Sequence, residues 1–158
     1  MPNMARIISG HNKKVTGSSI SMETKGCNCR SQPCPLEGKC KTTNVVYRST
    51  VEASGTTKQY IGLTSNTFKE RFTGHKASFT HRKNAHKTTL SSHIWGLKDE
   101  QTTYNQHWSI LSLAPSYSRR VRICHLCLME KTHISLADPR TTLNKRNEIV
   151  AKCRHRDK

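Results

Sequence analysis

The sequence predicts an α+β fold in which a three-stranded antiparallel sheet is flanked by helices and preceded by a cysteine-rich module. Residues 44–64 have the pattern of a β-hairpin, residues 106–114 have that of a third strand, and helical periodicity occurs between and after them. The chain has 158 residues, of which 33% are hydrophobic, so it can form one ordinary domain with a thin core. We therefore expect bound metal to add stability.

The hairpin consists of two runs of β-branched and aromatic residues joined by a polar loop that contains a glycine. Each run carries one tyrosine, Tyr47 in the first and Tyr60 in the second. The pleat of a sheet allows side chains on two neighbouring strands to point to the same face. We expect the two phenol groups to form one surface with two hydroxyls.

Two helices are expected between the hairpin and the third strand. The first runs from about residue 66 to 80 with Ser65 or Asn66 as its cap, and the second lies within residues 88–100. Apolar residues at helical spacing mark both helices: Phe68, Phe72 and Phe79 in the first, and Leu90, Ile94 and Leu97 in the second. Arg71 and His75 are one turn apart in the first helix and share a face.

The third strand, residues 106–114, alternates Trp108 and Ile110 with polar residues and should pair with the hairpin. A third helix is expected within residues 119–137, where Ile123, Cys127 and Ile134 form one stripe, and Asp138-Pro139 ends it. The segment 141–158 is expected to form a turn and a short basic helix.

Glu130 lies on the stripe of the third helix, where a core-facing apolar residue would be expected. An inward carboxylate is costly to desolvate unless a cation or hydrogen-bond donors receive it. A divalent metal ion could do so, and so could Arg71, in which case the pair would be a structural salt bridge.

The composition of the chain indicates what kind of partner it binds and in which compartment it acts. Lysine and arginine number 27 against 10 acids, a net charge of +17 that favours a polyanion such as nucleic acid over the alternative of a solvated surface or a basic localisation tail. No stretch has the length of a membrane span or the apolar centre of a signal peptide, so we expect an intracellular protein without a membrane partner. We divide the chain into a flexible leader or linker (1–25), a cysteine-rich zinc module (26–43), and a main domain with a basic tail (44–158).

The seven cysteines should stay reduced inside a cell, which favours metal ligation over disulfides. The first group, with spacing C-x-C-x4-C-x5-C, predicts a structural zinc site rather than free thiols: Cys27, Cys29, Cys34 and Cys40. A second Cys3His site is expected from a C-x2-C pair and a distant C-x-H pair: Cys124, Cys127, Cys153 and His155. For that group the alternatives are that Cys127 is a buried core residue, or that His125 replaces a ligand. One or two zinc ions are thus expected.

These residues, in this order, resemble the GIY-YIG endonuclease family. Its elements are matched by Val45-Val46-Tyr47, Tyr60-Ile61-Gly62, Arg71 and His75 in FKERFTGH, Glu130 in CLMEK, and Asn144 in TTLNKR. The resemblance covers roughly residues 44–146, and Val-Val replaces the family's Gly-Ile. The cysteine cluster, CHLCLMEK and LNKRNEIVAKCRH are similar to the C-terminal endonuclease domain of Penelope-like retroelements.

The resemblance implies hydrolysis of a DNA phosphodiester with one Mg²⁺ or Mn²⁺, which Glu130 would hold. Tyr47 would bind and deprotonate the water, Arg71 would grip phosphate oxygens, and Tyr60 and His75 would position phosphate or water. Asn144 would donate hydrogen bonds that support the site or the phosphate. To act as a base, Tyr47 needs a nearby cation, because an unperturbed tyrosine titrates near 10. The cut would be a nick in nuclear DNA that primes reverse transcription, with retroelement RNA and a polymerase domain in cis as further partners.

Basic side chains around the first helix and near the end of the chain are expected to contact DNA phosphates: Lys69, Lys76, Arg82, Lys83, Lys87, Lys145 and Arg146. Two alternatives to the nuclease stay open. One is a catalytically inactive zinc-stabilised module that binds nucleic acid, and the other is a zinc scaffold whose charge serves localisation.

Overall fold

The computed structural model describes residues 26–29, 33–118, 120, 123–153 and 155. It is an α+β fold built on a three-stranded antiparallel sheet flanked by helices, as the sequence predicts. The strands are β1 (Val45–Ala53), β2 (Thr56–Thr64) and β3 (Tyr104–Leu113), in the order β2-β1-β3. The third strand starts two residues earlier than its alternation indicates. The predicted leader, residues 1–25, lies outside the described residues.

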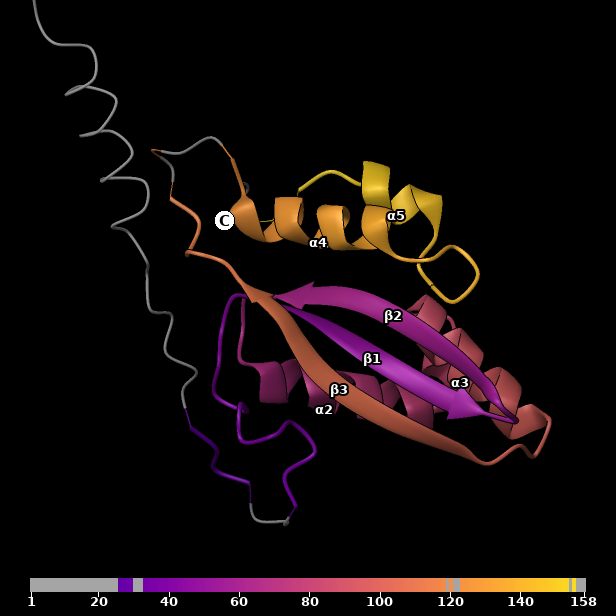
Figure 1. Ribbon diagram of the computed structural model, residues 1–158. Coiled ribbons are helices and arrows are strands. Elements are labelled where there is room, and N and C mark those ends of the chain that lie inside the picture. The colour runs from indigo at the N-terminus through magenta and orange to yellow at the C-terminus, as the bar shows by residue number, and fades with distance from the viewer. Residues whose placement is uncertain (1–25, 30–32, 119, 121–122, 154, 156–158) are drawn as a thin grey trace, which may run out of the picture.

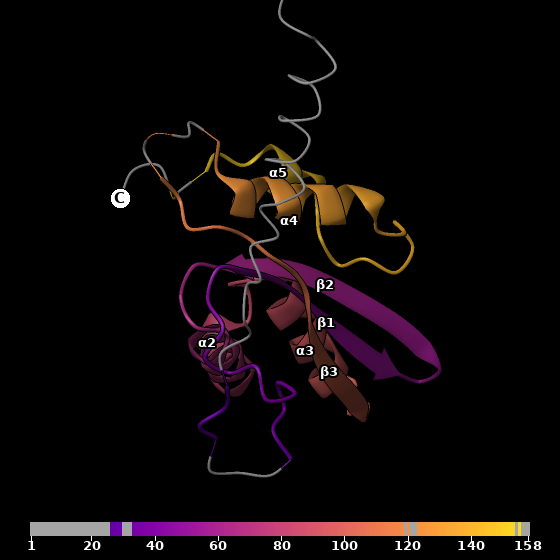
Figure 2. The ribbon, with the colours of Figure 1, turned by 60° about the vertical axis from the view of Figure 1, so that its left-hand side comes forward.

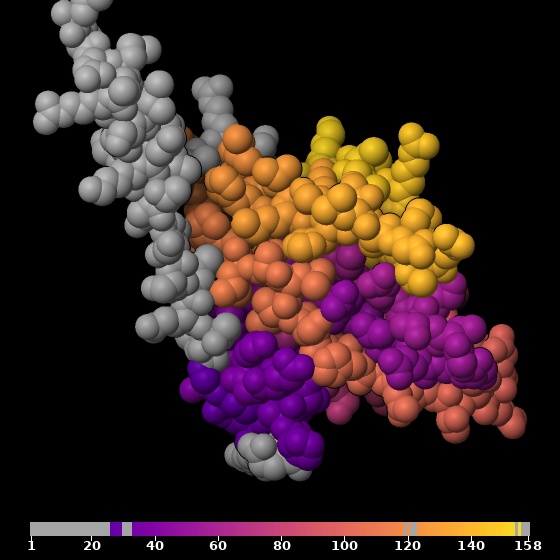
Figure 3. All heavy atoms as spheres, viewed as in Figure 1, coloured from indigo at the N-terminus to yellow at the C-terminus, as the bar shows by residue number. Residues whose placement is uncertain are grey.

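Helices cover both faces of the sheet (Figures 1 and 2). On one face lie α2 (Phe68–Thr80), the short 3-10 helix η1 (Arg82–Asn84) and α3 (Thr89–Asp99). On the other face lie α4 (His125–Leu136) and α5 (Arg146–Val150). In the space-filling view, the α4–α5 layer lies directly against the sheet, and the hairpin end of β1 and β2 extends beyond it (Figure 3).

The strand register explains why the core has two parts. Tyr47 is opposite Gly62 and Ser49 is opposite Tyr60, so the two tyrosines project from the same face, which is the α2 face. They belong to the larger core with Phe68 of α2 and Leu90 of α3. Alternate residues of the strands face α4 and form the smaller core: Val46 and Ile61 with Leu126 and Ile134.

The structure differs from the prediction at the start of two helices, and at α2 a capping box decides the start. Helix α2 begins after Thr67, whose hydroxyl accepts from the Glu70 N–H while the Glu70 carboxylate accepts from the Thr67 N–H. Helix α4 begins only after Cys124, and Ile123 precedes it with 53% of its surface exposed. Ile123 is therefore no part of the stripe that contains Cys127 and Ile134.

The chain returns to the edge of the sheet after α4. The Gln59 N–H donates to the Thr141 carbonyl over 2.9 Å, and the Leu143 N–H donates to the Gln59 carbonyl over 2.7 Å. This short parallel pairing covers the outer edge of β2 and places Asn144 and α5 beside it. Among the residues described, no helix is long and apolar enough to cross a membrane.

Candidate active site and metal centres

Tyr47 is the centre of a buried polar cluster on the α2 face. Its hydroxyl accepts a hydrogen bond from Nε of Arg71 over 2.8 Å and lies 2.7 Å from Nε2 of His75. Arg71 and His75 are four residues apart on α2 and meet the phenol from one helix face, as their spacing predicts. Tyr47 is fully buried and His75 is 2% exposed, so these contacts are shielded from bulk water.

Burial sets the protonation states in this cluster. Burial and, after it, the charge of Arg71 lower the pKa of His75 to about 3, so the imidazole is neutral at physiological pH. Burial also raises the pKa of Tyr47 to about 12, although the charge and hydrogen bond of Arg71 act in the opposite direction. The cation that the sequence calls for is therefore present, but burial outweighs it. The neutral imidazole can accept a hydrogen bond from the phenol O–H.

Gly62 makes room for the phenol of Tyr47. A Cβ at this position would lie 2.5 Å from Oη of Tyr47 and 3.0 Å from Cε1 of Tyr60. Any larger side chain would displace one or both tyrosines. Packing against the two tyrosines therefore requires a glycine at the third position of the Tyr60-Ile61-Gly62 motif, and this requirement does not follow from the motif alone.

A pocket with a volume of about 340 Å³ opens beside Tyr60 and Arg71 at the β2 edge. Tyr60 and Arg71 reach it from the α2 side. Glu130 from α4 and Glu148 from α5 line it from the opposite side of the sheet. The pocket thus joins side chains from both helical layers around the edge strand.

The negative charge of Glu130 is only partly balanced by nearby cations. Burial and then the charge of Glu148 raise its pKa to about 7, while Arg71 and Lys131 act in the opposite direction. Among the described residues no ion pair forms between Arg71 and Glu130. The simple salt-bridge alternative is therefore not observed. The donor set, carboxylates beside open space, fits a hard divalent cation.

Glu148 is the acidic residue that sequence reasoning missed. It lies in the five-residue α5, whose brevity hides any periodicity. Its signal was its position four residues after Asn144, one helical turn away. Asn144 itself does not point to open space but bonds both backbone groups of Ile61 and the carboxylate of Glu148.

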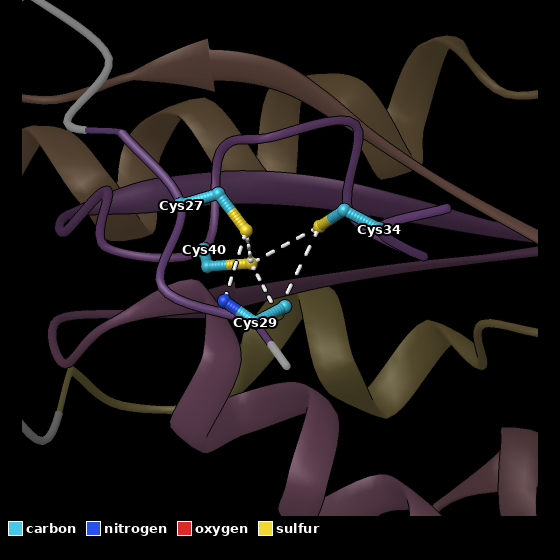
Figure 4. A group of neighbouring side chains, drawn as sticks. All are labelled: Cys27, Cys29, Cys34 and Cys40. Atoms are coloured by element: carbon cyan, nitrogen blue, oxygen red, sulfur yellow. Dashed lines mark hydrogen bonds between the residues drawn. The ribbon is translucent and has the colours of Figure 1, made fainter. Parts of the chain in front are cut away.

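The first cysteine group could hold a structural metal ion such as zinc. Its four sulfurs point toward one another (Figure 4), and Sγ of Cys40 lies 3.4 Å, 3.1 Å and 3.2 Å from those of Cys27, Cys29 and Cys34. Four thiolates at about 2.3 Å from one zinc ion are about 3.8 Å apart, close to these separations. Cys40 is buried in the larger core beside Leu36, so this group packs against the α2 face.

The second group could also hold such an ion, and it borders the pocket. Sγ of Cys127 lies 3.5 Å from Sγ of Cys153 and 3.2 Å from Nδ1 of His155, and Nδ1 of His155 lies 3.6 Å from Sγ of Cys124. The alternative ligand His125 is exposed and is not part of the group. Cys127 and His155 both line the pocket, so a metal here would tie the end of the chain to α4 beside Glu130.

The basic residues expected to contact DNA differ in their surroundings. Lys87 lines the pocket, and so does Lys152, which was not among the expected residues. Arg82 pairs with Asp99 through two hydrogen bonds and lies over the Trp95 ring, so its charge is largely offset. The remaining expected residues lie elsewhere: Lys69 donates to Asn28, Lys76 lies over Phe72, and Lys83, Lys145 and Arg146 are exposed.

Comparisons of the chain with protein-family models, with curated proteins and with solved structures found no match.

Proposed function

We propose that the protein is a divalent-metal-dependent DNA endonuclease that hydrolyses phosphodiester bonds. One observation carries the proposal: a phenol bonded to both an arginine and a neutral histidine lies next to a pocket that also contains an inward carboxylate. The resemblance of these residues to the GIY-YIG endonucleases supports the same reading. By that resemblance, the cut would be a nick that primes reverse transcription of a retroelement in the nucleus, with its RNA and polymerase as partners.

Each side chain has a role that its contacts allow. Arg71 uses its Nε–H on the phenol of Tyr47, and its remaining N–H groups can grip phosphate oxygens in the pocket. Tyr60 lines the pocket and positions the phosphate or the attacking water. Mg²⁺ or Mn²⁺ held by Glu130 would take up negative charge on the phosphate and the leaving oxygen.

The proton of the attacking water would leave through Tyr47. The hydrogen bond to Nε2 of His75 would orient the phenol, and the bound cation together with Arg71 would lower the pKa of Tyr47 so that it can accept the proton. Tyr47 is fully buried, so the water reaches its hydroxyl only if the contact with Arg71 or Tyr60 opens. Binding of a phosphate by Arg71 would provide that opening.

The two cysteine groups would each bind a structural Zn²⁺. Each offers four protein ligands and leaves no position for a reacting water, which is the pattern of structural sites. The first zinc would fasten the N-terminal module to the core, and the second would fasten the tail that borders the pocket.

Nicking of supercoiled plasmid tests the proposal. The zinc-loaded chain should nick plasmid with Mg²⁺ or Mn²⁺, and Glu130→Gln should lower the rate by about 10³-fold because charge stabilisation is lost. Tyr47→Phe should lower it by a comparable factor. Glu52→Gln, an equal charge change at an exposed strand position, should have no effect. An inactive parent chain, or Glu130→Gln with undiminished activity, would refute the proposal.

The burial of Tyr47 favours one alternative, an inactive module that binds nucleic acid. Such a module would retain DNA with steep salt dependence and leave plasmid intact at every concentration of Mg²⁺ or Mn²⁺. The same plasmid assay, run beside a filter-binding measurement, separates the two functions.

A further inference from the structure

The side chain of Asn144 has all its strong hydrogen-bonding groups engaged. Its Oδ1 accepts from the Ile61 N–H over 2.8 Å, and its Nδ2 donates to the Ile61 carbonyl over 2.8 Å and to Oε2 of Glu148. An amide nitrogen has two hydrogens, and both are used. Asn144 therefore has no donor left for a phosphate, and it meets the pocket only through Glu148.

These bonds fix Glu148 relative to the two tyrosines. Ile61 lies between Tyr60 and Gly62 on the edge strand, so Asn144 holds the start of α5 against the strand that carries the pocket phenol. Glu148 is partly buried and lines the pocket together with Glu130, which comes from α4. Two carboxylates from different helices thus face the same space.

The cations near this pair do not neutralise it by direct contact. Arg71 is hydrogen-bonded to Tyr47, the Lys131 ammonium donates to the Ala151 carbonyl over 2.7 Å, and two further lysines, Lys87 and Lys152, line the pocket. No ion pair within 4.0 Å involves Glu130 or Glu148 among the residues described. Mg²⁺ and Mn²⁺ sites of phosphate-cleaving proteins commonly use one or two carboxylates, with water and substrate phosphate completing the coordination.

We propose that Glu148 is the second carboxylate for the divalent cation of this pocket, and that Asn144 is a positioning residue that acts through it. The proposal rests on the function proposed above. It reassigns the asparagine of the motif, expected to support the site or the phosphate, to the support of a metal-binding carboxylate.

Direct binding of Mn²⁺ to the zinc-loaded full chain tests this assignment. The thiolate groups keep zinc because Mn²⁺ prefers oxygen ligands, so calorimetry or electron paramagnetic resonance reports the carboxylate site. The variants are Glu130→Gln, Glu148→Gln, Asn144→Ala, and Glu52→Gln as the matched charge control. Zinc content and the unfolding midpoint confirm that each variant is folded.

We expect Glu148→Gln to weaken Mn²⁺ binding at least about tenfold and Asn144→Ala to weaken it by a smaller factor, as is found for residues that orient metal ligands. Glu52→Gln should bind as the parent does. A double variant that combines Asn144→Ala with Glu148→Gln should bind Mn²⁺ no more weakly than Glu148→Gln alone, because Asn144 acts only through that carboxylate. If Asn144→Ala does not fold, Glu148→Gln alone decides the question.

Unchanged Mn²⁺ affinity in Glu148→Gln, with binding lost in Glu130→Gln, would overturn the assignment and leave the nuclease proposal intact. A parent chain that binds no Mn²⁺ would also overturn it. The predicted binding pattern in a chain that never nicks plasmid would support the assignment and refute the nuclease.

Discussion

The candidate active site has two halves that are held together by different forces. The sheet half, Tyr47, Tyr60, Arg71 and His75, is fixed by core packing: the ring of Tyr47 lies 5.5 Å from that of Phe68, and its hydroxyl bonds two side chains of α2. The tail half, Glu130, Asn144 and Glu148, is partly exposed and is fixed by hydrogen bonds and the second cysteine group. Core packing is thus the main force on the sheet half, whereas the tail half depends on hydrogen bonds and on a cysteine group that could hold a metal ion.

Ligand substitutions in the two cysteine groups should show this difference most strongly. Cys40→Ser disrupts a group buried in the larger core and should lower the free energy of unfolding by several kcal/mol, about 3 or more, because a structural zinc contributes folding energy directly. Cys153→Ser should cost less stability but lower plasmid nicking about a hundredfold, because the tail carrying Glu148 and Lys152 is released. Zinc content, thermal unfolding and nicking measure these effects. Equal losses of stability and of nicking activity in both variants would show that the two cysteine groups do not support the two halves of the site differently.

Gly62→Ala tests the packing that holds the sheet half. The new Cβ would collide with Oη of Tyr47, so we expect a loss of about 1–3 kcal/mol, typical of overpacked cores, together with a loss of nicking. Gly74→Ala is the matched control, because it lies on α2 between Arg71 and His75 with nothing within 4 Å of its added Cβ. It should gain up to about 1 kcal/mol from helix propensity. A stable, active Gly62→Ala chain would contradict the observed phenol geometry.

The two halves should respond to pH with opposite signs. His75 has its pKa lowered by burial from 6.5 to about 3, so the unfolded state binds more protons and stability falls as pH drops below about 6.5. Glu130 has its pKa raised by burial from 4.5 to about 7, so the folded state binds more protons and stability falls as pH rises from about 4.5 to 7.

Single variants separate these two opposing dependences of stability on pH. Between pH 4.5 and 6.5, Glu130→Gln should lose stability on acidification, and His75→Gln should lose it on going to higher pH. Each slope is limited to about 1.4 kcal/mol per pH unit, the value for one proton. Denaturant unfolding without added Mg²⁺ or Mn²⁺ measures both. Parallel slopes in the two variants would show that the halves do not differ in this way.

The smallest effects are expected for single lysines in DNA binding. Lys87 and Lys152 both line the pocket, and replacing either with Gln should reduce the slope of log affinity against log salt by about 0.9. Arg82→Gln should change it less, because Asp99 already offsets that charge. Filter binding between low and moderate salt provides the slopes. A larger effect for Arg82 would place the DNA on α3 rather than over the pocket.

The sequence predicted the sheet half well because its signals are local and periodic. Strand alternation put Tyr47 and Tyr60 on one face, and the spacing of Arg71 and His75 put them on one helix face. The same reasoning located the second cysteine group, since four metal-ligating residues at the ends of two segments are hard to place otherwise.

The tail half was less predictable because its contacts join residues far apart in the chain. The pairing of Gln59 with residues 141–143 has no periodic signature, yet it decides where Asn144 and Glu148 lie. The motif also does not show burial: the sequence indicates that Tyr47 needs a nearby cation to act as a base, and Arg71 is that cation, but desolvation of the phenol outweighs it and raises the pKa. Local patterns identify the groups, and the fold determines their environment.

Anomalous diffraction from crystals of the zinc-loaded chain with Mn²⁺ tests the central claim most directly, that the two halves meet around one cation. We predict a single manganese peak in the pocket, coordinated by Glu130 and within reach of Glu148, directly or through a bound water, on the side that faces Arg71. A manganese peak elsewhere, or an empty pocket with both carboxylates turned to solvent, would contradict it.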